Sequence, residues 1–368
     1  MFQIRLRPDG ARDRSALLAR LRPLARARGL RVVAAEDVHE DGKKFGNFAE
    51  FLYLVPDGEA VPSPTSALEL VRDVASWPEV RDVVAADAAP HRAGRVLPGF
   101  EVGGVRFGGG GLTVVAGPCA VDDPAALPDF ADALRRAGAG ALRGGAWKPR
   151  TSPYAFQGLG AAGLRALAAA RRASGLPVVT EVLDPRDLEL AVEHADVLQI
   201  GSRNMHDGVL LHEAGATGLP VLVKRGRSAS LDELLYALEY VAAGGSSRVL
   251  LCERGLRHFD PAVRNLLDLS AVPLLKQRTG APVLVDPSHA TGRAALVPPM
   301  MAAAVAAGAD GLLVEVHPDP KRALSDAEQA LDAATFRTAM RTVRAVLAAL
   351  GRELHQPAPA PSLERTHP

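Results

Sequence analysis

The stretch Leu142-Arg143-Gly144-Gly145-Ala146-Trp147-Lys148-Pro149-Arg150-Thr151-Ser152-Pro153-Tyr154 leaves a short apolar run and brings three cations close together in the chain. Arginine offers a planar fork of donors and lysine a point charge, and phosphate oxygens accept hydrogen bonds from both. The glycines let backbone N–H groups approach a ligand, and the prolines stiffen the loop. A solvated basic loop is the plain alternative. Because glycines, prolines and cations serve one geometry here, we predict a phosphate-binding loop at the end of a strand.

Apolar runs rich in β-branched residues alternate with amphipathic Ala/Leu segments on both sides of this stretch, which indicates alternating strands and helices. Eight strands are predicted, at residues 112–116, 141–144, 177–182, 196–200, 220–223, 248–251, 282–285 and 311–314. The last helix is predicted to run from near Asp326 to about Leu350. Eight β/α units match a closed (β/α)8 TIM barrel, whereas an open doubly wound sheet more often stops at about five or six strands.

The flanking segments predict a second, smaller unit and two irregular stretches. Residues 1–88 read as a βαββαβ ferredoxin-like domain, with a proline, Pro23, where the first helix should kink or end early. Residues 89–98 form a predicted linker, 99–350 the barrel with an N-terminal hairpin centred on Gly103-Gly104, and 351–368 a disordered Pro-rich tail.

Composition excludes several classes of function. The 368-residue chain carries a formal net charge of +1, which argues against a general nucleic-acid or anionic-membrane binder. It has two cysteines, no apolar run long enough to span a bilayer and no secretory pattern at its N-terminus. We therefore expect a soluble cytoplasmic protein with reduced thiols.

Active sites of such barrels lie at the C-terminal ends of the strands. The charged or coordinating residues at those positions are Cys119, Arg143, Lys148, Arg150, Glu181, Arg203, Lys224, Glu253, Arg254, Asp286, His289, Glu315 and His317. Each unpaired ion in a partly dry cleft costs on the order of several kcal/mol. Six cations at one mouth therefore predict a polyanionic ligand, most simply one or two phosphorylated small molecules carrying a carboxylate. Pairing with an acid across the rim is the alternative for one or two of the cations, but Glu181, Glu253 and Asp286 are too few to neutralise all six.

A second constellation consists of Cys119, His289, Glu315 and Asp326. A thiolate, an imidazole and two carboxylates suit a borderline divalent cation such as Mn²⁺, Fe²⁺, Co²⁺ or Zn²⁺ and suit Mg²⁺ or Ca²⁺ poorly. Taken singly, the cysteine could be a small buried apolar residue and the histidine a loop hydrogen-bonder. Four such residues at one rim favour a metal site, whereas Cys252, inside a strand, is expected only to pack.

Seven motifs occur in order along the chain: Ala116-Gly117-Pro118-Cys119, Lys148-Pro149-Arg150-Thr151-Ser152-Pro153, Gln199-Ile200-Gly201-Ser202-Arg203-Asn204-Met205, Val223-Lys224-Arg225-Gly226, Cys252-Glu253-Arg254-Gly255, Asp286-Pro287-Ser288-His289-Ala290-Thr291-Gly292 and Glu315-Val316-His317-Pro318. Together they resemble 3-deoxy-7-phosphoheptulonate (DAHP) synthase, from about Glu101 to Ala333. The N-terminal unit resembles the regulatory domain of short type I-beta members. The sister octulosonate-phosphate synthases carry Lys-Ala-Asn-Arg-Ser where this chain has Lys148-Pro149-Arg150-Thr151-Ser152, which favours erythrose 4-phosphate as the second substrate.

The resemblance implies a metal-dependent, aldol-like condensation of phosphoenolpyruvate with erythrose 4-phosphate, the first step of the shikimate pathway to chorismate and the aromatic amino acids. It implies that Cys119, His289, Glu315 and Asp326 bind the metal. Arg143, Lys148, Arg203, Lys224 and Arg254 would hold phosphoenolpyruvate beside His289, and Arg150, Thr151 and Ser152 would hold the aldose phosphate. We expect Lys148, crowded by cations, to have a lowered pKa and to transfer a proton to the new alkoxide, and Glu181 to position the attacking water.

The N-terminal unit, residues 1–88, leaves open which effector it binds and how the protein assembles. An aromatic amino acid is the candidate effector for residues 1–88, and the enzyme is expected to be a homo-oligomer, dimer or tetramer. A catalytically silent barrel that only senses such an amino acid is the competing class, disfavoured by the intact set of ligands and cations. A fused chorismate mutase is not indicated, because that module is all helical and this unit reads as strand-rich.

Overall fold

The computed structural model describes residues 2–7, 14–34, 51–57, 64–85, 96–150 and 152–357. Contacts divide the chain into two compact units, Met1–Ala89 and Pro90–Pro368. Thr151, named above, lies outside the described residues.

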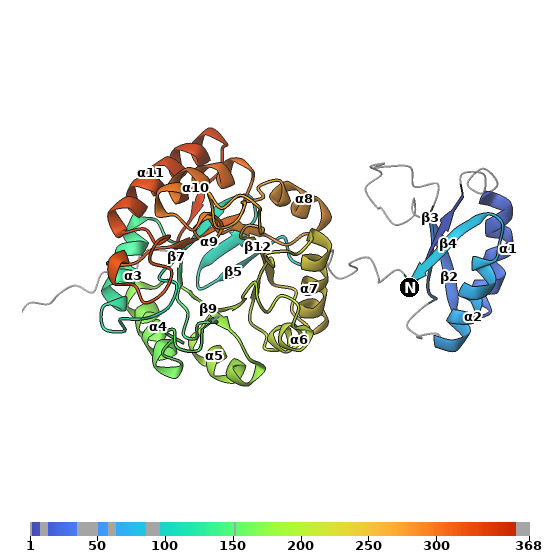
Figure 1. The fold of residues 1–368 in the computed structure, drawn as a ribbon, viewed down its shortest axis with the longest axis horizontal. Helices are drawn as coiled ribbons and strands as arrows, with labels where there is room; N and C mark the ends of the chain where they lie inside the picture. Colours follow the sequence, from blue (N-terminus) through green and yellow to red (C-terminus); the bar gives the residue numbers. More distant parts are fainter. Residues whose placement is uncertain are drawn as a thin grey trace, which may run out of the picture. The chain divides into compact units, whose positions relative to one another are not determined.

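The first unit has the order β1 (Phe2–Leu6), α1 (Arg14–Arg26), β2 (Leu30–Ala34), β3 (Phe51–Pro56), α2 (Pro64–Ala75) and β4 (Val80–Ala85). Its sheet has the antiparallel order β2-β3-β1-β4, and both helices cover one face of it (Figure 1). The predicted early end at Pro23 is wrong, because α1 continues to Arg26 with the proline inside it. Leu17, Leu21 and Ala25 form a buried stripe along α1, and burial of this stripe outweighs the hydrogen bond that proline cannot make.

The second unit is a closed parallel barrel. Its strands are β7 (Leu112–Gly117), β8 (Ala141–Arg143), β9 (Val178–Val182), β10 (Val197–Ile200), β11 (Val221–Lys224), β12 (Val249–Glu253), β13 (Val283–Val285) and β14 (Gly311–Glu315). Each pairs with the next, and β14 pairs with β7 to close the ring, which confirms the predicted (β/α)8 barrel. Nearly every residue of these strands is buried, so they are continuously apolar rather than alternating.

The helices surround the ring of strands (Figure 1). They are α3 (Leu127–Ala137), α4 (Ala161–Ser174), α5 (Leu188–His194), α6 (Gly208–Ala216), α7 (Leu231–Ala243), α8 (Ala271–Arg278), α9 (Pro287–Thr291), α10 (Val297–Ala306) and α11 (Ala333–Ala349). The main core lies between strands and helices. No helix in the described part of the chain is long and apolar enough to cross a membrane.

The N-terminal end of the barrel is closed by two segments. The hairpin β5 (Gly99–Val102) and β6 (Val105–Gly108) places Phe100 and Phe107, with ring centroids 6.1 Å apart, in the cluster that fills the barrel interior. The short strand β15 (Leu354–His355) pairs with the start of β7, so the predicted disordered tail from 351 is wrong at its beginning. The predicted linker also ends sooner than 98, because Val96 is buried and Leu97 N donates to Ser247 O at 2.9 Å. Closure at this end leaves the opposite end for ligands.

Candidate active site

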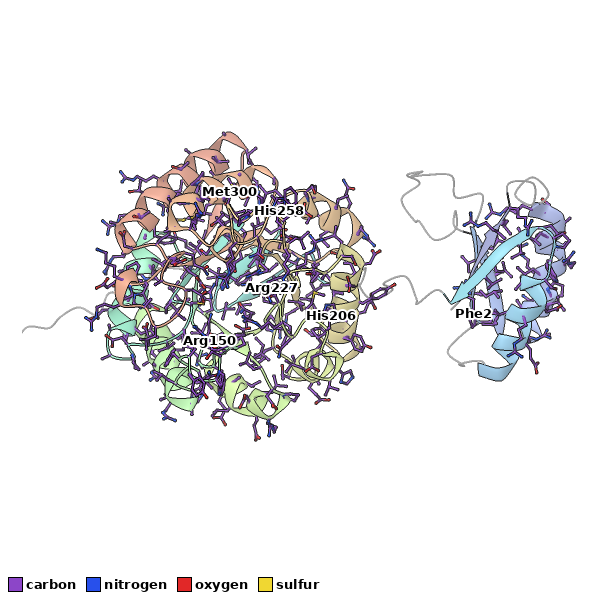
Figure 2. The ribbon with its side chains drawn as sticks, viewed as in Figure 1. Phe2, Arg150, His206, Arg227, His258 and Met300 are labelled. Carbon is purple, nitrogen blue, oxygen red and sulfur yellow. The ribbon has the colours of Figure 1, made fainter. Side chains whose placement is uncertain are left out.

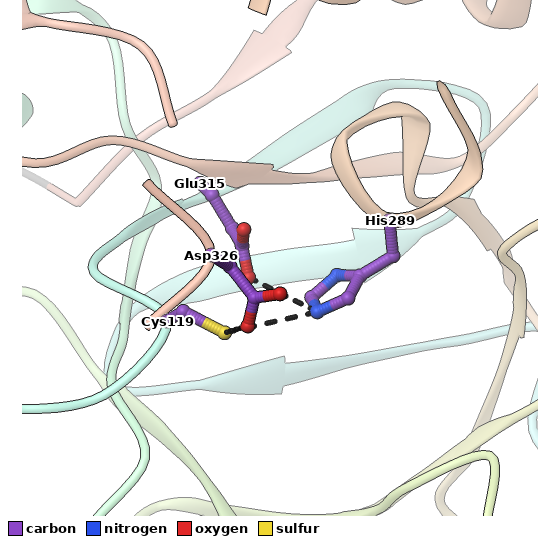
Figure 3. A group of neighbouring side chains, drawn as sticks. All are labelled: Cys119, His289, Glu315 and Asp326. Atoms are coloured by element: carbon purple, nitrogen blue, oxygen red, sulfur yellow. Dashed lines mark hydrogen bonds and ion pairs between the residues drawn. The ribbon is translucent and has the colours of Figure 1, made fainter. Parts of the chain in front are cut away.

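Four donor side chains meet at the C-terminal end of the barrel. Cys119, His289, Glu315 and Asp326 each offer one ligand atom, and these atoms all lie within 4.8 Å of one another. Cys119 Sγ lies 3.1 Å from Asp326 Oδ2 and 3.7 Å from His289 Nε2 (Figure 3). His289 Nε2 in turn lies 3.1 Å from Glu315 Oε1. The structure therefore brings together all four residues predicted as ligands.

His289 is oriented by the short helix α9, which follows β13 directly. The carboxylate of Asp286 caps this helix by accepting from His289 N at 2.9 Å, and its other oxygen lies 2.7 Å from His289 Nδ1. Because a carboxylate only accepts, Nδ1 carries the proton and Nε2 presents its lone pair to the other three donors. Asp286 thus fixes the tautomer that a metal ligand requires.

Asp326 reaches the group from a loop, and the prediction that it begins the last helix is wrong. Helix α11 starts at Ala333, where Asp332 caps it by accepting from Thr335 N at 2.7 Å. The loop returns beside β14, since Leu331 N donates to Glu315 O and His317 N to Leu331 O, both at 2.9 Å. Asp326 has φ 52°, a left-handed conformation that a right-handed helix cannot contain but that aspartate tolerates.

The donor set fits a borderline divalent cation. Burial, reinforced by the Glu315 carboxylate, raises the pKa of the Cys119 thiol well above its ordinary value. Burial lowers the pKa of His289 to about 4, so the imidazole is neutral at pH 7. Burial opposes ionisation of Glu315, yet His289 and Arg143 hold its pKa below the ordinary value. A neutral imidazole, two carboxylates and a thiol whose proton a cation would displace are suitable ligands for such an ion.

The pKa of Lys148 shifts in the opposite direction to the one predicted. Its Nζ lies 2.8 Å from Asp326 Oδ2 and also donates to Cys119 Sγ. Burial works to lower the pKa of Lys148, but Cys119, Asp326 and Glu315 raise it above the ordinary value. The expected lowered pKa is therefore wrong, because Lys148 lies beside a thiol and carboxylates rather than beside other cations.

A cavity of about 350 Å³ opens beside the four donors, and His289 and Asp326 form part of its wall. Its cationic lining residues are Lys148, Arg150, Arg203, Lys224, Arg227, Arg254 and Arg264. Figure 2 shows Arg227 near the middle of the ring of strands and Arg150 over its α4 side. The convergence of cations on one mouth thus has a concave space at its centre.

More of the predicted cations are paired than expected. Arg143 lies 3.2 Å from Glu315, Lys148 pairs with Asp326, and Lys224 pairs with Asp286. Two of these partners are the candidate ligands Glu315 and Asp326, which sequence spacing does not place beside the cations. Glu253 does not neutralise any of the six, because it pairs at 2.9 Å with Arg225, which also reaches Asp268 at 3.0 Å.

Arg254 differs from Arg143, Lys148 and Lys224, the other buried cations of the six, because no acidic group among the described residues pairs with it. It is 3% exposed, and its Nε and Nη1 have no hydrogen-bond partner among the residues that the structure describes. Burial and the nearby Arg264 and Arg227 lower its pKa, with Asp286 acting in the opposite direction. A buried guanidinium with two unsatisfied nitrogens, in a residue that lines a cationic cavity, is suited to an anionic ligand.

The loop from 142 to 154 contributes differently from its prediction. Gly144 N donates to Val179 O and Gly145 N to Cys119 O, both at 3.2 Å, so these N–H groups are used within the protein. A Cβ at Gly145 would lie 2.8 Å from Cys119 O, which shows that the glycines let this loop pack on the Cys119 loop. Arg150 and Ser152 do line the cavity.

Glu181 and Arg203 also line the cavity. Arg203 Nη1 donates to Pro149 O at 3.1 Å, and this hydrogen bond connects the loop after β10 to the 142–154 loop. Glu181 lies directly over Gly201, where a Cβ would stand 1.8 Å from its Oε1. The absence of a side chain at 201 therefore makes room for the Glu181 carboxylate at the cavity wall.

Sequence reasoning missed several residues of this site. Arg227, Arg264 and Gln199 line the cavity, and Gln329 donates to Glu315 Oε2. His317 Nε2 lies 3.1 Å from Asp122, which joins the β14 and β7 loops rather than facing the cavity. The run Lys224-Arg225-Gly226-Arg227 after a strand was a visible signal for Arg227. Arg264 and Gln329 lie in loops without strand signals, so only the fold reveals them.

Comparison with known proteins identifies related chains. The model of the DAHP synthetase I family matches residues 87–349. Phospho-2-dehydro-3-deoxyheptonate aldolase of Thermotoga maritima is 47% identical over 252 residues, which cover 68% of this chain and 75% of the relative. A 2-dehydro-3-deoxyphosphooctonate aldolase of Nitratidesulfovibrio vulgaris is 37% identical over 232 residues, covering 58% of this chain and 84% of the relative.

Solved structures agree with these relatives. A crystal structure of phospho-2-dehydro-3-deoxyheptonate aldolase (DAHP synthase) from Thermotoga maritima superposes with a TM-score of 0.75 at 35% identity, covering 96% of this chain and 98% of that one. A truncated form of 3-deoxy-D-arabino-heptulosonate 7-phosphate synthase from the same organism covers 70% of this chain and 95% of its own length, with a TM-score of 0.66 at 42% identity.

Proposed function

The chain belongs to the DAHP synthetase I family, and from this membership we infer that it is a 3-deoxy-7-phosphoheptulonate synthase. The enzyme condenses phosphoenolpyruvate with erythrose 4-phosphate to give DAHP and phosphate, the first step of the shikimate pathway. The observation that carries this function is one cavity lined by cations, with two of the four candidate metal ligands, His289 and Asp326, in its wall. Two phosphorylated substrates, one with a carboxylate, match that charge.

We propose that Cys119, His289, Glu315 and Asp326 hold the metal, and that it is Mn²⁺, Fe²⁺, Co²⁺ or Zn²⁺. Their donor atoms converge within 4.8 Å, and a thiol in the set disfavours Mg²⁺ and Ca²⁺. When bound, such a cation supplies a Lewis acid for the aldehyde oxygen of the second substrate.

We propose that Arg254, Lys224, Arg203 and Lys148 bind phosphoenolpyruvate, with Arg143 beneath them. Arg254 contributes two unsatisfied donors, and Lys148, whose pKa is raised, remains a cation that stabilises negative charge without itself titrating near neutral pH. Arg143 does not line the cavity, but its Nη2 donates to Glu315 Oε1 at 3.2 Å and holds that ligand in place.

The aldose phosphate is assigned to Arg150 and Ser152, at the outer part of the same cavity, and to Thr151 from the sequence motif. With the two substrates side by side, C3 of phosphoenolpyruvate attacks the aldehyde carbon, water adds at C2, and phosphate leaves with C–O cleavage. Glu181 in the cavity wall is the proposed group for positioning that water.

We propose a regulatory role for residues 1–88, with an aromatic amino acid as the effector. Support comes from the T. maritima structure, whose match extends over 96% of this chain and so beyond the barrel. Cytoplasmic location and assembly as a dimer or tetramer stay predictions from the sequence and the family.

The decisive assay supplies the purified full chain with phosphoenolpyruvate and either erythrose 4-phosphate or arabinose 5-phosphate, and measures phosphate release and the sugar product. We expect turnover with erythrose 4-phosphate, loss of turnover with a chelator, and recovery on adding Mn²⁺ or Co²⁺. A preference for arabinose 5-phosphate would contradict the substrate assignment. Turnover unaffected by exhaustive chelation would contradict the metal site alone.

A further inference from the structure

Glu315 and Asp326, the two carboxylates among the four candidate metal ligands, each use their two oxygens differently. Glu315 Oε1 lies 3.1 Å from His289 Nε2, while its Oε2 accepts a hydrogen bond from Gln329 Nε2. Asp326 Oδ2 lies 3.1 Å from Cys119 Sγ, while its Oδ1 accepts from Arg264 Nη1 at 3.1 Å. In each case one oxygen lies among the other three ligand residues, where Arg143 also donates to Glu315 Oε1 at 3.2 Å and Lys148 Nζ lies 2.8 Å from Asp326 Oδ2, and the second oxygen is bonded outside the group.

The two outer oxygens are joined by one continuous chain of hydrogen bonds. Arg264 Nη1, which donates to Asp326, also donates to Gln329 Oε1 at 2.7 Å. Gln329 then donates to Glu315, so the order is Glu315, Gln329, Arg264, Asp326. This series of hydrogen bonds connects Glu315, on β14, with Asp326, in the loop before α11.

Gln329 is chemically suited to this position. It is 2% exposed, and an amide carries both a donor and an acceptor, which here are used on Glu315 and Arg264 respectively. An ionised glutamate could not donate to Glu315, and an apolar residue could neither donate nor accept. A buried amide satisfied on both sides has a single preferred orientation, so it holds its neighbours in one geometry.

We propose that Gln329 and Arg264 are positioning residues for the metal centre, each reserving one carboxylate oxygen so that Glu315 and Asp326 present a single oxygen to the divalent cation. The inference rests on the proposed metal site. Outer partners of this kind typically contribute about 10- to 100-fold to metal affinity by orienting the ligands. They also oppose a switch of Glu315 to binding through both oxygens.

Arg293 provides a matched control for Arg264, because both arginines line a second cavity. This cavity, of about 550 Å³, is lined by Arg293 and by Arg264, Asp326 and Gln329 of the hydrogen-bonded series. Arg293 is exposed and, among the described residues, donates to neither ligand carboxylate. Replacing Arg293 removes the same charge from the same cavity but leaves the chain of hydrogen bonds whole.

The test measures Co²⁺ binding to the metal-free full chain by competition with a chelator, together with the visible absorption spectrum of the bound Co²⁺. Gln329→Met and Arg264→Met should each weaken Co²⁺ binding about 10- to 100-fold. The double variant should be weaker than either single variant, because each residue holds a different carboxylate, but by less than the product of the two effects, because Arg264 and Gln329 are also bonded to each other. The Co²⁺ bands should lose intensity in Gln329→Met as Glu315 gains a second contact, and Arg293→Met should match the unaltered protein.

Gln329→Glu keeps the size of the side chain and should behave like Gln329→Met, which separates loss of the donor from a packing defect. Melting of each metal-free variant checks folding, and Arg264 is exposed enough that its replacement should be tolerated. Unaltered Co²⁺ affinity and spectrum in both Gln329→Met and Arg264→Met would overturn this inference and leave the metal site standing. Failure of the unaltered protein to bind Co²⁺ would overturn both.

Discussion

Replacing Arg254 should weaken ligand binding but stabilise the ligand-free protein. Its guanidinium is buried, and two of its nitrogens have no hydrogen-bond partner among the described residues. Arg254→Met should raise the apparent KM for phosphoenolpyruvate about tenfold to a hundredfold, since a charge-assisted contact contributes about 1.5–3 kcal/mol. The same change should raise the melting temperature of the ligand-free protein, because it removes an uncompensated buried charge. Steady-state kinetics and calorimetry on one preparation measure both.

Two other arginines are controls for this prediction. Arg143→Met leaves the buried Glu315 without its partner and should lower the melting temperature instead. Arg150→Ala should mainly raise the KM for erythrose 4-phosphate. A lowered melting temperature in Arg254→Met, or equal effects of Arg254 and Arg150 on both substrates, would contradict the division of the cavity.

Cys119 is the ligand that makes the donor set selective. Cys119→Ser replaces a soft thiolate with a weak hydroxyl ligand, so we expect a folded barrel whose metal affinity falls by more than the roughly 10- to 100-fold typical of outer partners. Metal content after dialysis and turnover measure the effect. Cys252→Ala is the matched control, because Cys252 is fully buried in the barrel interior with its pKa raised to about 12 by burial. Normal metal content in Cys119→Ser would remove Cys119 from the site.

Among the elements, the β12–α8 connection is held by a buried charge. Arg225 donates to Glu253 at 2.9 Å and to Asp268 at 3.0 Å, which ties β11 and β12 to the segment before α8. Burial opposes ionisation of Asp268, but Ser270 and Arg225 hold its pKa below the ordinary value of an aspartate. A carboxyl whose pKa is lower in the folded than in the unfolded protein stabilises the fold at any pH above its unfolded pKa. This stabilisation is lost as the pH falls towards the pKa of the carboxyl in the folded protein.

Asp268→Asn should therefore lower the free energy of unfolding by about 1–3 kcal/mol at pH 7. The difference from the unaltered protein should shrink as pH falls from 5 towards 3, as urea unfolding at each pH would measure. Asp260→Asn, on the same connection but exposed, should change stability little. A difference that stays constant or grows on acidification would contradict the role of the Arg225 pair.

Elements differed in how well the sequence predicted them. The eight strands are recognisable because burial on both faces requires continuous apolar runs, as in Val221–Lys224. The start of α11 was misplaced because Asp326 can begin a helix by its residue type, whereas its left-handed φ depends on the return of the loop beside β14. The Arg143–Glu315 pair joins residues 172 positions apart, a proximity that only barrel closure creates.

The site shows the same distinction. Strand-end positions followed from the barrel, so Cys119, His289 and Glu315 were accessible to sequence reasoning. The direction of the Lys148 pKa shift was not, since it depends on whether anions or cations are its nearest neighbours. Gln329 and Arg264 have no pattern in the sequence, because their role depends on which carboxylate oxygen each one reaches.

At the scale of the whole molecule, the barrel is closed without residues 1–95. Val96 is buried against it, the β5–β6 hairpin fills its N-terminal end, and Arg352 donates to the carbonyls of Gly110, Gly111 and Ala309. The first unit has its own core, which includes Ile4, Leu21 and Leu54. Each unit thus buries its own apolar surface, which is the condition for folding alone.

A chain beginning at Val96 should consequently be folded, active and metal-dependent, and it should no longer respond to tyrosine or phenylalanine. If an aromatic amino acid binds residues 1–88 and favours an inhibited arrangement, it needs only a few kcal/mol of differential affinity between arrangements, about 10- to 100-fold, to control turnover. Turnover of the full and shortened chains with rising amino acid measures this. A chain beginning at Val105 is the control, because it lacks β5 and the stacked Phe100 and should fold poorly. A full chain already insensitive to tyrosine, phenylalanine, tryptophan, chorismate and prephenate would overturn the regulatory role and leave assembly as the better account of the small unit.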